Sequence, residues 1–268
     1  MNLTYKNKLY KGFVFSNLNL GANYFLLSID IGKTTTNPIP GQFLNLYVGN
    51  YKSFILPRPF TIFDFSHNDE VGSTIHILYR VVGKGTEEIS KLAKGDEIEF
   101  IYPLGNGFQI RGSKPLLIAG GSGIASLHYL ANILQNDGIK FQFFVGVRNN
   151  SEYNSIKKVL DGFDLCWAVE EDTIKGIFHG NVVELYKAKS KIDYDEIFIC
   201  GPTEMLKSFA SIFDNSKRTS VYCSLEARMA CGVGACLGCA IPTKSGYKLC
   251  CSDGPVFEMS DILWKHLP

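Results

Sequence analysis

Several common signals are missing from this 268-residue sequence, and each absence removes a class of function. The 27 lysines and arginines nearly balance the 26 aspartates and glutamates, so the formal net charge of +1 gives no general attraction to nucleic acid or to an anionic membrane surface. No segment approaches the roughly 20 apolar residues of a membrane-spanning helix, and the N-terminus lacks the apolar core of a secretory signal. We therefore expect a soluble cytoplasmic protein that binds neither nucleic acid nor membrane.

Cysteine, in contrast, is plentiful, and in the cytoplasm eight cysteines fit metal binding better than disulfides. The run Cys-Gly-Val-Gly-Ala-Cys-Leu-Gly-Cys places Cys231, Cys236 and Cys239 with four and then two intervening residues, and Cys251 follows farther along. This is the spacing of plant-type [2Fe–2S] ferredoxins. The small residues between the cysteines let the backbone curl tightly and direct N–H groups toward sulfur. The sequence thus predicts a [2Fe–2S] cluster bound by these four cysteines.

The fourth ligand and the kind of metal leave alternatives open. Cys236 and Cys239 form a pair that would also suit zinc, but Cys250 and Cys251 are adjacent, and neighbouring side chains on an extended segment point to opposite faces. Only one of the two is expected to be a ligand. We choose Cys251 because it directly precedes Ser252-Asp253-Gly254-Pro255, a turn-forming sequence, and we expect Cys250 to be buried. A structural zinc site and a disulfide framework remain the rival interpretations.

The pattern of apolar residues changes once along the chain. Residues up to about 110 show short alternating runs such as 24–29 and 74–80, broken by clusters of Gly, Pro and Asn, which is typical of an antiparallel barrel or sandwich. From residue 114, apolar strands and amphipathic helices alternate, which indicates a parallel sheet with crossover helices. The expected strands are 115–119, 141–147, 165–169 and 196–200, and the expected helices follow Gly123 and span 151–160 and 203–213.

We therefore predict a multidomain β and α/β protein. Residues 1–112 form an antiparallel β-barrel, residues 113–218 a Rossmann-like parallel α/β domain that binds a nucleotide, and residues 219–268 a small domain that binds the cluster.

Two strand-to-helix turns of the α/β part are suited to nucleotide phosphates. Gly120-Gly121-Ser122-Gly123 ends one strand and opens a helix, where unpaired N–H groups and the helix dipole favour an anion. The spacing is not the dinucleotide fingerprint, and glycine also serves tight turns for steric reasons alone, so both interpretations stay open. Cys200-Gly201-Pro202 occupies the equivalent place after a later strand, at the edge where open α/β sheets bind ligands.

Two segments of the N-terminal half place positive charge beside turn residues. In Arg58-Pro59-Phe60-Thr61 the guanidinium can pair with a phosphate and the hydroxyl with a ring nitrogen. In the segment 79–86 an arginine is followed by glycines that expose N–H donors. A segment of either kind, taken alone, is more often an ordinary surface turn with a solvated arginine, whereas the two together suggest a second nucleotide.

These motifs occur in the order found in a known family. The chain resembles the ferredoxin–NADP reductase superfamily over essentially its whole length, and within it the electron transfer subunits of B-type dihydroorotate dehydrogenases. The most specific segments are 224–236 and 251–257, around the cysteines, and 102–108 matches the end of the family's barrel. One departure concerns the nucleotide turn, which often reads Gly-Ile-Ala-Pro but here has Ser126 in the last place.

The resemblance assigns residues to three redox groups. It implies that FAD contacts two segments of the chain, that NAD contacts a third set of residues and that the four cysteines bind the cluster. It also implies that this chain has no acid–base catalytic residue. The residues implied for FAD are Arg58, Pro59, Phe60, Thr61, Leu78, Tyr79, Arg80, Gly85 and Thr86, and those implied for NAD are Gly121, Gly123 and Cys200.

The resemblance also implies a partner. An FMN-containing catalytic subunit would oxidise dihydroorotate in de novo pyrimidine (UMP) biosynthesis, and its electrons would pass through the cluster and FAD to NAD+, in a heterotetramer of two catalytic and two electron transfer subunits. Two alternatives remain. The same module could serve a sulfide dehydrogenase, hydrogenase or NADH–ferredoxin transhydrogenase, or the chain could be a zinc-stabilised binding module without enzymatic activity.

Overall fold

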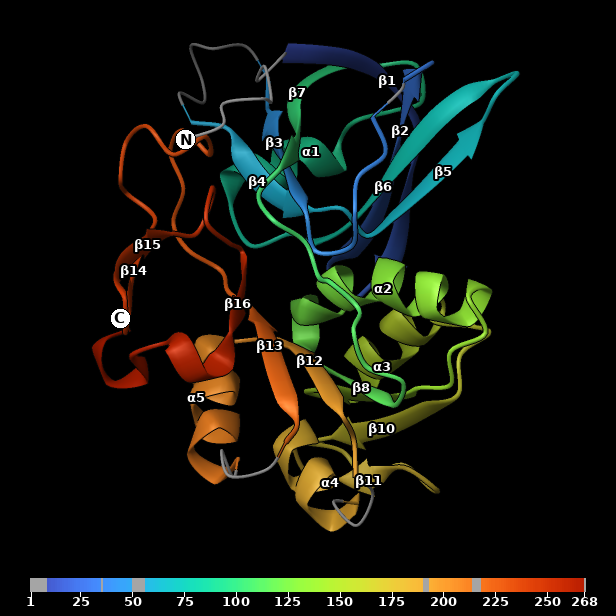
Figure 1. Ribbon diagram of the computed structural model, residues 1–268. Helices are drawn as coiled ribbons and strands as arrows, with labels where there is room; N and C mark the ends of the chain where they lie inside the picture. The colour runs from blue at the N-terminus through green and yellow to red at the C-terminus, as the bar shows by residue number, and fades with distance from the viewer. Residues whose placement is uncertain (1–8, 35, 50–55, 190–192, 214–217, 268) are drawn as a thin grey trace.

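The computed structural model describes residues 9–34, 36–49, 56–189, 193–213 and 218–267. Two seven-stranded sheets lie one above the other, and the C-terminal segment runs along one side of both (Figure 1). The expected fold class, an antiparallel barrel followed by a mainly parallel α/β sheet and a small C-terminal part, is confirmed.

The first sheet is antiparallel throughout and curls so that β4, at one edge, also contacts β6 near the other. Alternate residues of its strands face inward and form a separate apolar core that includes Leu27, Ile29, Leu44 and Phe100. The strand order is β4-β3-β7-β1-β2-β6-β5, with β1 Leu9–Gly21, β2 Tyr24–Gly32, β3 Phe43–Tyr47, β4 Arg58–Thr61, β5 Asp64–Asn68, β6 Gly72–Arg80 and β7 Glu97–Leu104, and the short helix α1 Lys84–Ser90 follows β6.

The second sheet is parallel except for its last strand. Its order is β11-β10-β9-β8-β12-β13-β16, with β8 Pro115–Gly120, β9 Gln142–Val147, β10 Leu165–Val169, β11 Phe178–His179, β12 Glu196–Cys200, β13 Ser220–Ser224 and the antiparallel β16 Val256–Glu258. The helices are α2 Ile124–Asn136, α3 Asn150–Lys157, α4 Val182–Lys189 and α5 Thr203–Ile212.

Helices cover both faces of this sheet, which explains why its strands are almost uniformly apolar. On β8, Leu117 and Ala119 pack with the helices α2 and α3, whereas Leu116 and Ile118 belong to the core under α4 and α5. The three helices and four strands expected from the alternating pattern are all present, with ends shifted by a few residues, whereas α4 and β11 were not predicted.

The strand order reverses between β8 and β12. From β8 the chain proceeds outward to β9, β10 and β11, and it then returns to the other side at β12. Such a reversal leaves a crevice at the carboxyl ends of the two strands. Both expected nucleotide turns therefore lie side by side, because Gly120 ends β8 and Cys200 ends β12. The close approach needs a glycine, since a Cβ on Gly123 would lie 2.3 Å from the carbonyl oxygen of Cys200.

The C-terminal segment joins the two sheets. Its hairpin pairs β14 Ala240–Thr243 with β15 Gly246–Leu249, and short 3₁₀ helices at Met259–Asp261 and Trp264–His266 follow β16. Asn106, where the chain leaves the barrel, donates its backbone N–H to Gly254 and its side-chain N–H groups to the carbonyls of Ser252 and Asp253. The division of the chain into three domains at 112/113 and 218/219 stays a proposal. Strands β13 and β16 lie beyond the second of these boundaries, and they extend the α/β sheet.

None of the helices in the described part of the chain is both long enough and apolar enough to cross a membrane.

Gly123→Ala tests the close contact at the sheet reversal. We expect a loss of roughly 1–3 kcal/mol in the free energy of unfolding, because the added methyl group meets backbone rather than a movable side chain. Urea denaturation of the full chain measures this loss. Gly83→Ala is the matched control, since its Cβ would enter open space and its extended backbone accepts alanine. Equal urea midpoints for the two variants would contradict the prediction.

Candidate functional site

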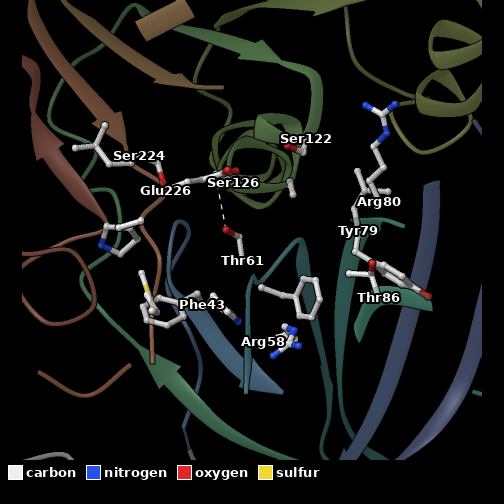
Figure 2. A pocket seen from close by; sticks show the side chains of 18 of the residues that line it. Phe43, Arg58, Thr61, Tyr79, Arg80, Thr86, Ser122, Ser126, Ser224 and Glu226 are labelled. Atoms are coloured by element: carbon white, nitrogen blue, oxygen red, sulfur yellow. Dashed lines mark hydrogen bonds between the residues drawn. The ribbon is translucent and has the colours of Figure 1, made fainter. Parts of the chain in front are cut away.

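A cavity of about 400 Å³ lies between the barrel and the α/β sheet, and all but one of the residues expected to contact FAD line it. Figure 2 shows them converging from β4, β6 and α1. The cavity is lined by Arg58, Pro59, Phe60, Thr61, Leu78, Tyr79, Arg80 and Thr86, with Phe43, Val82, Ser122, Ala125, Ser126, Ser224, Leu225, Glu226, Ala227, Met229 and Pro255.

The remaining expected residue, Gly85, lies directly behind the Arg58 guanidinium. A Cβ on Gly85 would be 2.6 Å from Nε of Arg58, so a larger residue here would displace the guanidinium from its position against the first turn of α1. Thr86 closes the turn, because its hydroxyl accepts the N–H groups of Val82 and Gly83 and donates to the Gly83 carbonyl. The two flavin segments predicted from sequence therefore form one local structure.

The far wall of the cavity carries polar groups that the sequence analysis did not assign to the flavin site. Ser126 on α2 donates a hydrogen bond of 3.3 Å to the Thr61 hydroxyl across the gap (Figure 2). Glu226 opens onto the cavity and its side chain is exposed, but the protein atoms around its carboxyl in the cleft reduce its solvation and raise its pKa above the ordinary value of 4.5. Cys200 lies behind this wall, where burial raises the pKa of its thiol to about 12 and keeps it neutral.

A second cavity of about 440 Å³ opens at the carboxyl edge of the α/β sheet. Gly121 lines it, whereas Gly123 and Cys200 lie behind it and set how closely β8 and β12 approach. It is lined by Gly120, Gly121, Pro202, Glu204, Met205 and Ser208 beside the sheet reversal, by Gly146, Val147, Arg148, Glu170, Asn181, Val182 and Val183 beyond it, and by Arg80 and Glu152.

Arg80 borders both cavities and pairs with the α/β part. Its Nη1 lies 3.0 Å from Oε1 of Glu152, a buried carboxylate on α3, and its guanidinium points away from Arg58 (Figure 2). The other carboxylate oxygen of Glu152 accepts the backbone N–H of Arg148, which lines the second cavity. Arg80 is thus placed to act on a ligand in the second cavity as well as in the first.

The four expected cluster ligands lie close together: Cys231, Cys236 and Cys239 are in the loop before β14, and Cys251 is in the turn after β15, and we call these two segments together the cysteine loop. The thiol of Cys236 donates a hydrogen bond to the sulfur of Cys231, and the thiol of Cys251 donates one to the sulfur of Cys239. Backbone N–H groups also face these sulfurs: Val233 and Cys236 donate to Cys231, at 3.5 and 3.4 Å, and Gly234 donates to Cys251 at 3.2 Å. Burial opposes ionisation of Cys231, but these N–H groups outweigh it and lower the pKa of its thiol to about 7.

The adjacent Cys250 is oriented differently. Its thiol is fully buried and donates to the carbonyl of Leu225, and burial raises its pKa well above the ordinary value. Cys251 instead accepts the Gly234 N–H and contacts the Cys239 thiol. The side chains of these two adjacent residues therefore point in opposite directions, so that Cys251 faces the other expected ligands and Cys250 does not.

The loop is chemically suited to an iron–sulfur cluster. It presents two pairs of thiols and several N–H donors, and a [2Fe–2S] cluster takes four thiolates, two on each iron, with its charge stabilised by such donors. Within the described ranges, no group of three or more His, Cys, Asp or Glu side chains is placed so that it could hold a metal ion.

Comparison with known proteins connects this loop to a family. Residues 226–263 match the model of the iron–sulfur cluster binding domain of dihydroorotate dehydrogenase B. The chain is 36% identical over 253 residues to the dihydroorotate dehydrogenase B (NAD(+)) electron transfer subunit of Clostridium acetobutylicum, covering 93% of this chain and 95% of that one. It is 34% identical over 231 residues to the protein of the same name from Bacillus caldolyticus, covering 84% and 86%.

Solved structures share the fold. An NADH-dependent reduced ferredoxin–NADP oxidoreductase studied for flavin-based electron bifurcation covers all of this chain and 93% of its own, with a TM-score of 0.79 and 25% identity. A ferredoxin NADP+ reductase from Neisseria gonorrhoeae, solved with bound FAD and NADP, covers 76% of this chain and 89% of its own, with a TM-score of 0.62 and 18% identity. The second supports the fold alone.

Cys251→Ala and Cys250→Ala separate the two adjacent cysteines. We expect Cys251→Ala to lose most of its iron and acid-labile sulfide, because a loop thiol is removed, and Cys250→Ala to keep both, because its thiol faces Leu225. Anaerobic reconstitution followed by iron and sulfide analysis measures both. Full cluster content in Cys251→Ala, with loss in Cys250→Ala, would reverse the assignment.

Glu226→Gln should change how stability depends on pH. Since the pKa of Glu226 is raised in the folded chain, the folded state holds the proton more tightly than the unfolded one, and stability falls as pH rises from 4.5 through the raised pKa. Gln cannot ionise, so the stability of the variant relative to the wild type should increase as pH rises through this range. Urea unfolding between pH 4 and 8 measures the difference, with the exposed Glu70→Gln as control. A difference that stays constant with pH for Glu226→Gln would refute the prediction.

Proposed function

Since the chain belongs to the family of electron transfer subunits of dihydroorotate dehydrogenase B, we propose that it passes electrons from an FMN-containing catalytic subunit to NAD+ in de novo pyrimidine (UMP) biosynthesis, by way of a [2Fe–2S] cluster and FAD. A bound flavin would exchange a hydride with nicotinamide and single electrons with a cluster. The chain itself has to hold these groups close together and in order.

One observation supports this function above all others: a single cavity is lined by residues from all three parts of the chain. Thr61 and Tyr79 come from the barrel, Ser122 from the nucleotide turn, and Met229 and Pro255 from the segments beside the cysteines. A ring bound there would meet the nucleotide on one side and approach the cluster loop on the other. Such proximity is what an electron relay requires.

The barrel residues would bind FAD. Arg58, backed by Gly85, would pair with the pyrophosphate, while Thr61 and Tyr79 would line the ring. Ser126 holds the Thr61 hydroxyl from the opposite wall, so the hydroxyl has a fixed direction before a ligand binds. Burial raises the pKa of Tyr79 to about 12, although a hydrogen bond to Asn17 opposes this, and its phenol therefore stays neutral.

The second cavity would bind NAD. The Gly121 turn offers backbone N–H groups for the pyrophosphate, and Arg148 and Arg80 add positive charge on the same cavity. Glu170 lines the cavity too, where a carboxylate suits ribose hydroxyls and repels a 2′-phosphate. The Arg148 guanidinium is bound by Glu171, with Nε 2.5 Å from Oε1, so its charge is partly offset. This balance favours NAD over NADP.

The exposed side of the cysteine loop would face the partner. Cys236 is exposed, and Leu237 beside it is 65% exposed in a left-handed conformation with φ of 60°. We propose a heterotetramer of two catalytic and two electron transfer subunits in the cytoplasm. None of the eight cysteines forms a disulfide, which fits a reducing compartment.

A second candidate is favoured by the structural comparison. The NADH-dependent reduced ferredoxin–NADP oxidoreductase matches the whole chain in fold, which supports the same module working with a different partner. The partner that co-purifies distinguishes this alternative from the first.

Anaerobic co-purification followed by assays of Cys231→Ala tests the function. We expect the wild type to purify with an FMN-containing subunit and to support dihydroorotate-dependent reduction of NAD+. In Cys231→Ala this activity should fall at least ~100-fold, whereas NADH-dependent reduction of ferricyanide should persist, because the flavin and nucleotide cavities remain.

Cys166→Ala is the control, since its thiol lies on β10 beside Lys189, away from the loop. Undiminished dihydroorotate-dependent turnover in a Cys231→Ala protein shown to lack iron would reject the relay.

A further inference from the structure

A buried amide of the barrel contacts the cysteine loop. Asn45 on β3 has no exposed surface, and its Nδ2 donates a 3.2 Å hydrogen bond to the carbonyl oxygen of Cys231. The acceptor fixes the orientation of the amide, because the rotated form would place Oδ1 against another oxygen. A barrel strand thus holds the backbone of a residue expected to bind the cluster.

Stability alone does not account for an asparagine here. Within the part of the chain that the structure describes, Oδ1 of Asn45 is buried and has no hydrogen-bond partner. An unsatisfied buried acceptor is destabilising, and its neighbours Leu44 and Leu46 show that this strand otherwise uses apolar residues in the interior. A buried polar atom without a hydrogen-bond partner departs from the usual rule of packing, and such departures are expected at functional positions.

The loop is shaped to accept this amide. Gly232 has φ of 70°, and a Cβ there would lie 2.0 Å from Nδ2 of Asn45. The contact is therefore possible only with glycine. Immediately after Gly232, the N–H groups of Val233, Gly234 and Cys236 turn toward the sulfurs of Cys231 and Cys251. The Cys231 carbonyl, which Asn45 holds, belongs to the first peptide group of the segment that carries these N–H donors.

The same strand pair carries the expected flavin motif. In the register of β3 with β4, Asn45 lies opposite Pro59, and Phe43 lies opposite Thr61. Phe43, Pro59 and Thr61 all line the first cavity. One short ribbon therefore contacts the flavin cavity along its length and the cysteine loop at Asn45.

We infer that Asn45 is a positioning residue for the iron–sulfur cluster: by holding the Cys231 carbonyl it orients the N–H donors of residues 233–236 and so sets the reduction potential of the cluster. Hydrogen bonds to cluster sulfurs are a principal control of that potential. This inference rests on the proposed [2Fe–2S] cluster and assigns a role to a residue outside the ligand set.

The test compares Asn45→Ala with the wild type as full chains reconstituted anaerobically. Asn132→Ala is the matched control, because its amide also joins the barrel to the α/β part, through Asp64, but lies on α2 and does not contact the loop. The readouts are iron and sulfide content, flavin absorbance, the electron paramagnetic resonance spectrum of the reduced cluster and its midpoint potential in a dye-mediated titration.

We expect Asn45→Ala to keep its flavin, to change the resonance spectrum and to shift the equilibrium constant for one-electron reduction about tenfold, which is ~59 mV. Asn132→Ala should match the wild type in both readouts. If Asn45→Ala does not fold, Asn45→Ser replaces it, since a hydroxyl keeps a shorter donor and should give a smaller shift.

A potential and spectrum equal to those of the wild type in a loaded Asn45 variant, or the same shift in Asn132→Ala, would overturn the inference and leave the proposed function intact. A wild-type chain that binds no iron and sulfide would instead overturn the proposed function.

Discussion

The packing of the C-terminal segment against both sheets is the constraint on which the three sites depend. Asn106 fixes the turn after Cys251 to the end of the barrel, Asn45 holds Cys231 to a barrel strand, and β16 adds this segment to the α/β sheet. Without these contacts the first cavity would lack one wall and the cysteine loop would lack its support. The relay is therefore a property of the docked arrangement of all three parts, since none of them contains the complete site.

Burial and hydrogen bonding have opposite effects on the pKa of the Cys231 thiol, whereas burial dominates for Cys251 and for the thiols of the interior. Thiols that face the interior, such as Cys200 and Cys250, stay neutral because burial raises their pKa. The Cys231 thiol is partly buried too, yet the N–H groups of its loop lower its pKa to about 7. The N–H groups of the loop thus favour the thiolate form of Cys231, and the same groups would face cluster sulfur. Position in the chain does not distinguish these cysteines; their surroundings do.

The parts of the fold that follow from local pattern were predictable. The continuous apolar runs at 115–119 and 196–200 indicated strands covered on both faces, and the adjacent cysteines indicated that only one of them faces the loop. Strands β13 and β16 were harder, because their pairing joins residues far apart in sequence. The same reason explains why the sequence analysis did not assign Ser126, Glu226 and Asn45 to a site. Each becomes part of a site only when separate elements of the fold pack together, and the spacing of residues in the sequence does not predict such contacts.

Arg80 was placed correctly in the flavin cavity by the resemblance, but this assignment covers only part of its surroundings. The resemblance placed it with the flavin residues, and it does line that cavity, yet its guanidinium is held by Glu152 of the α/β part and also borders the second cavity. Glu152 in turn accepts the N–H of Arg148, at the edge of the second cavity. A buried carboxylate bonded to groups from both sides keeps the two cavities in a fixed relation. A hydride passes only between rings in close, aligned contact, so this fixed relation is itself part of what the relay requires.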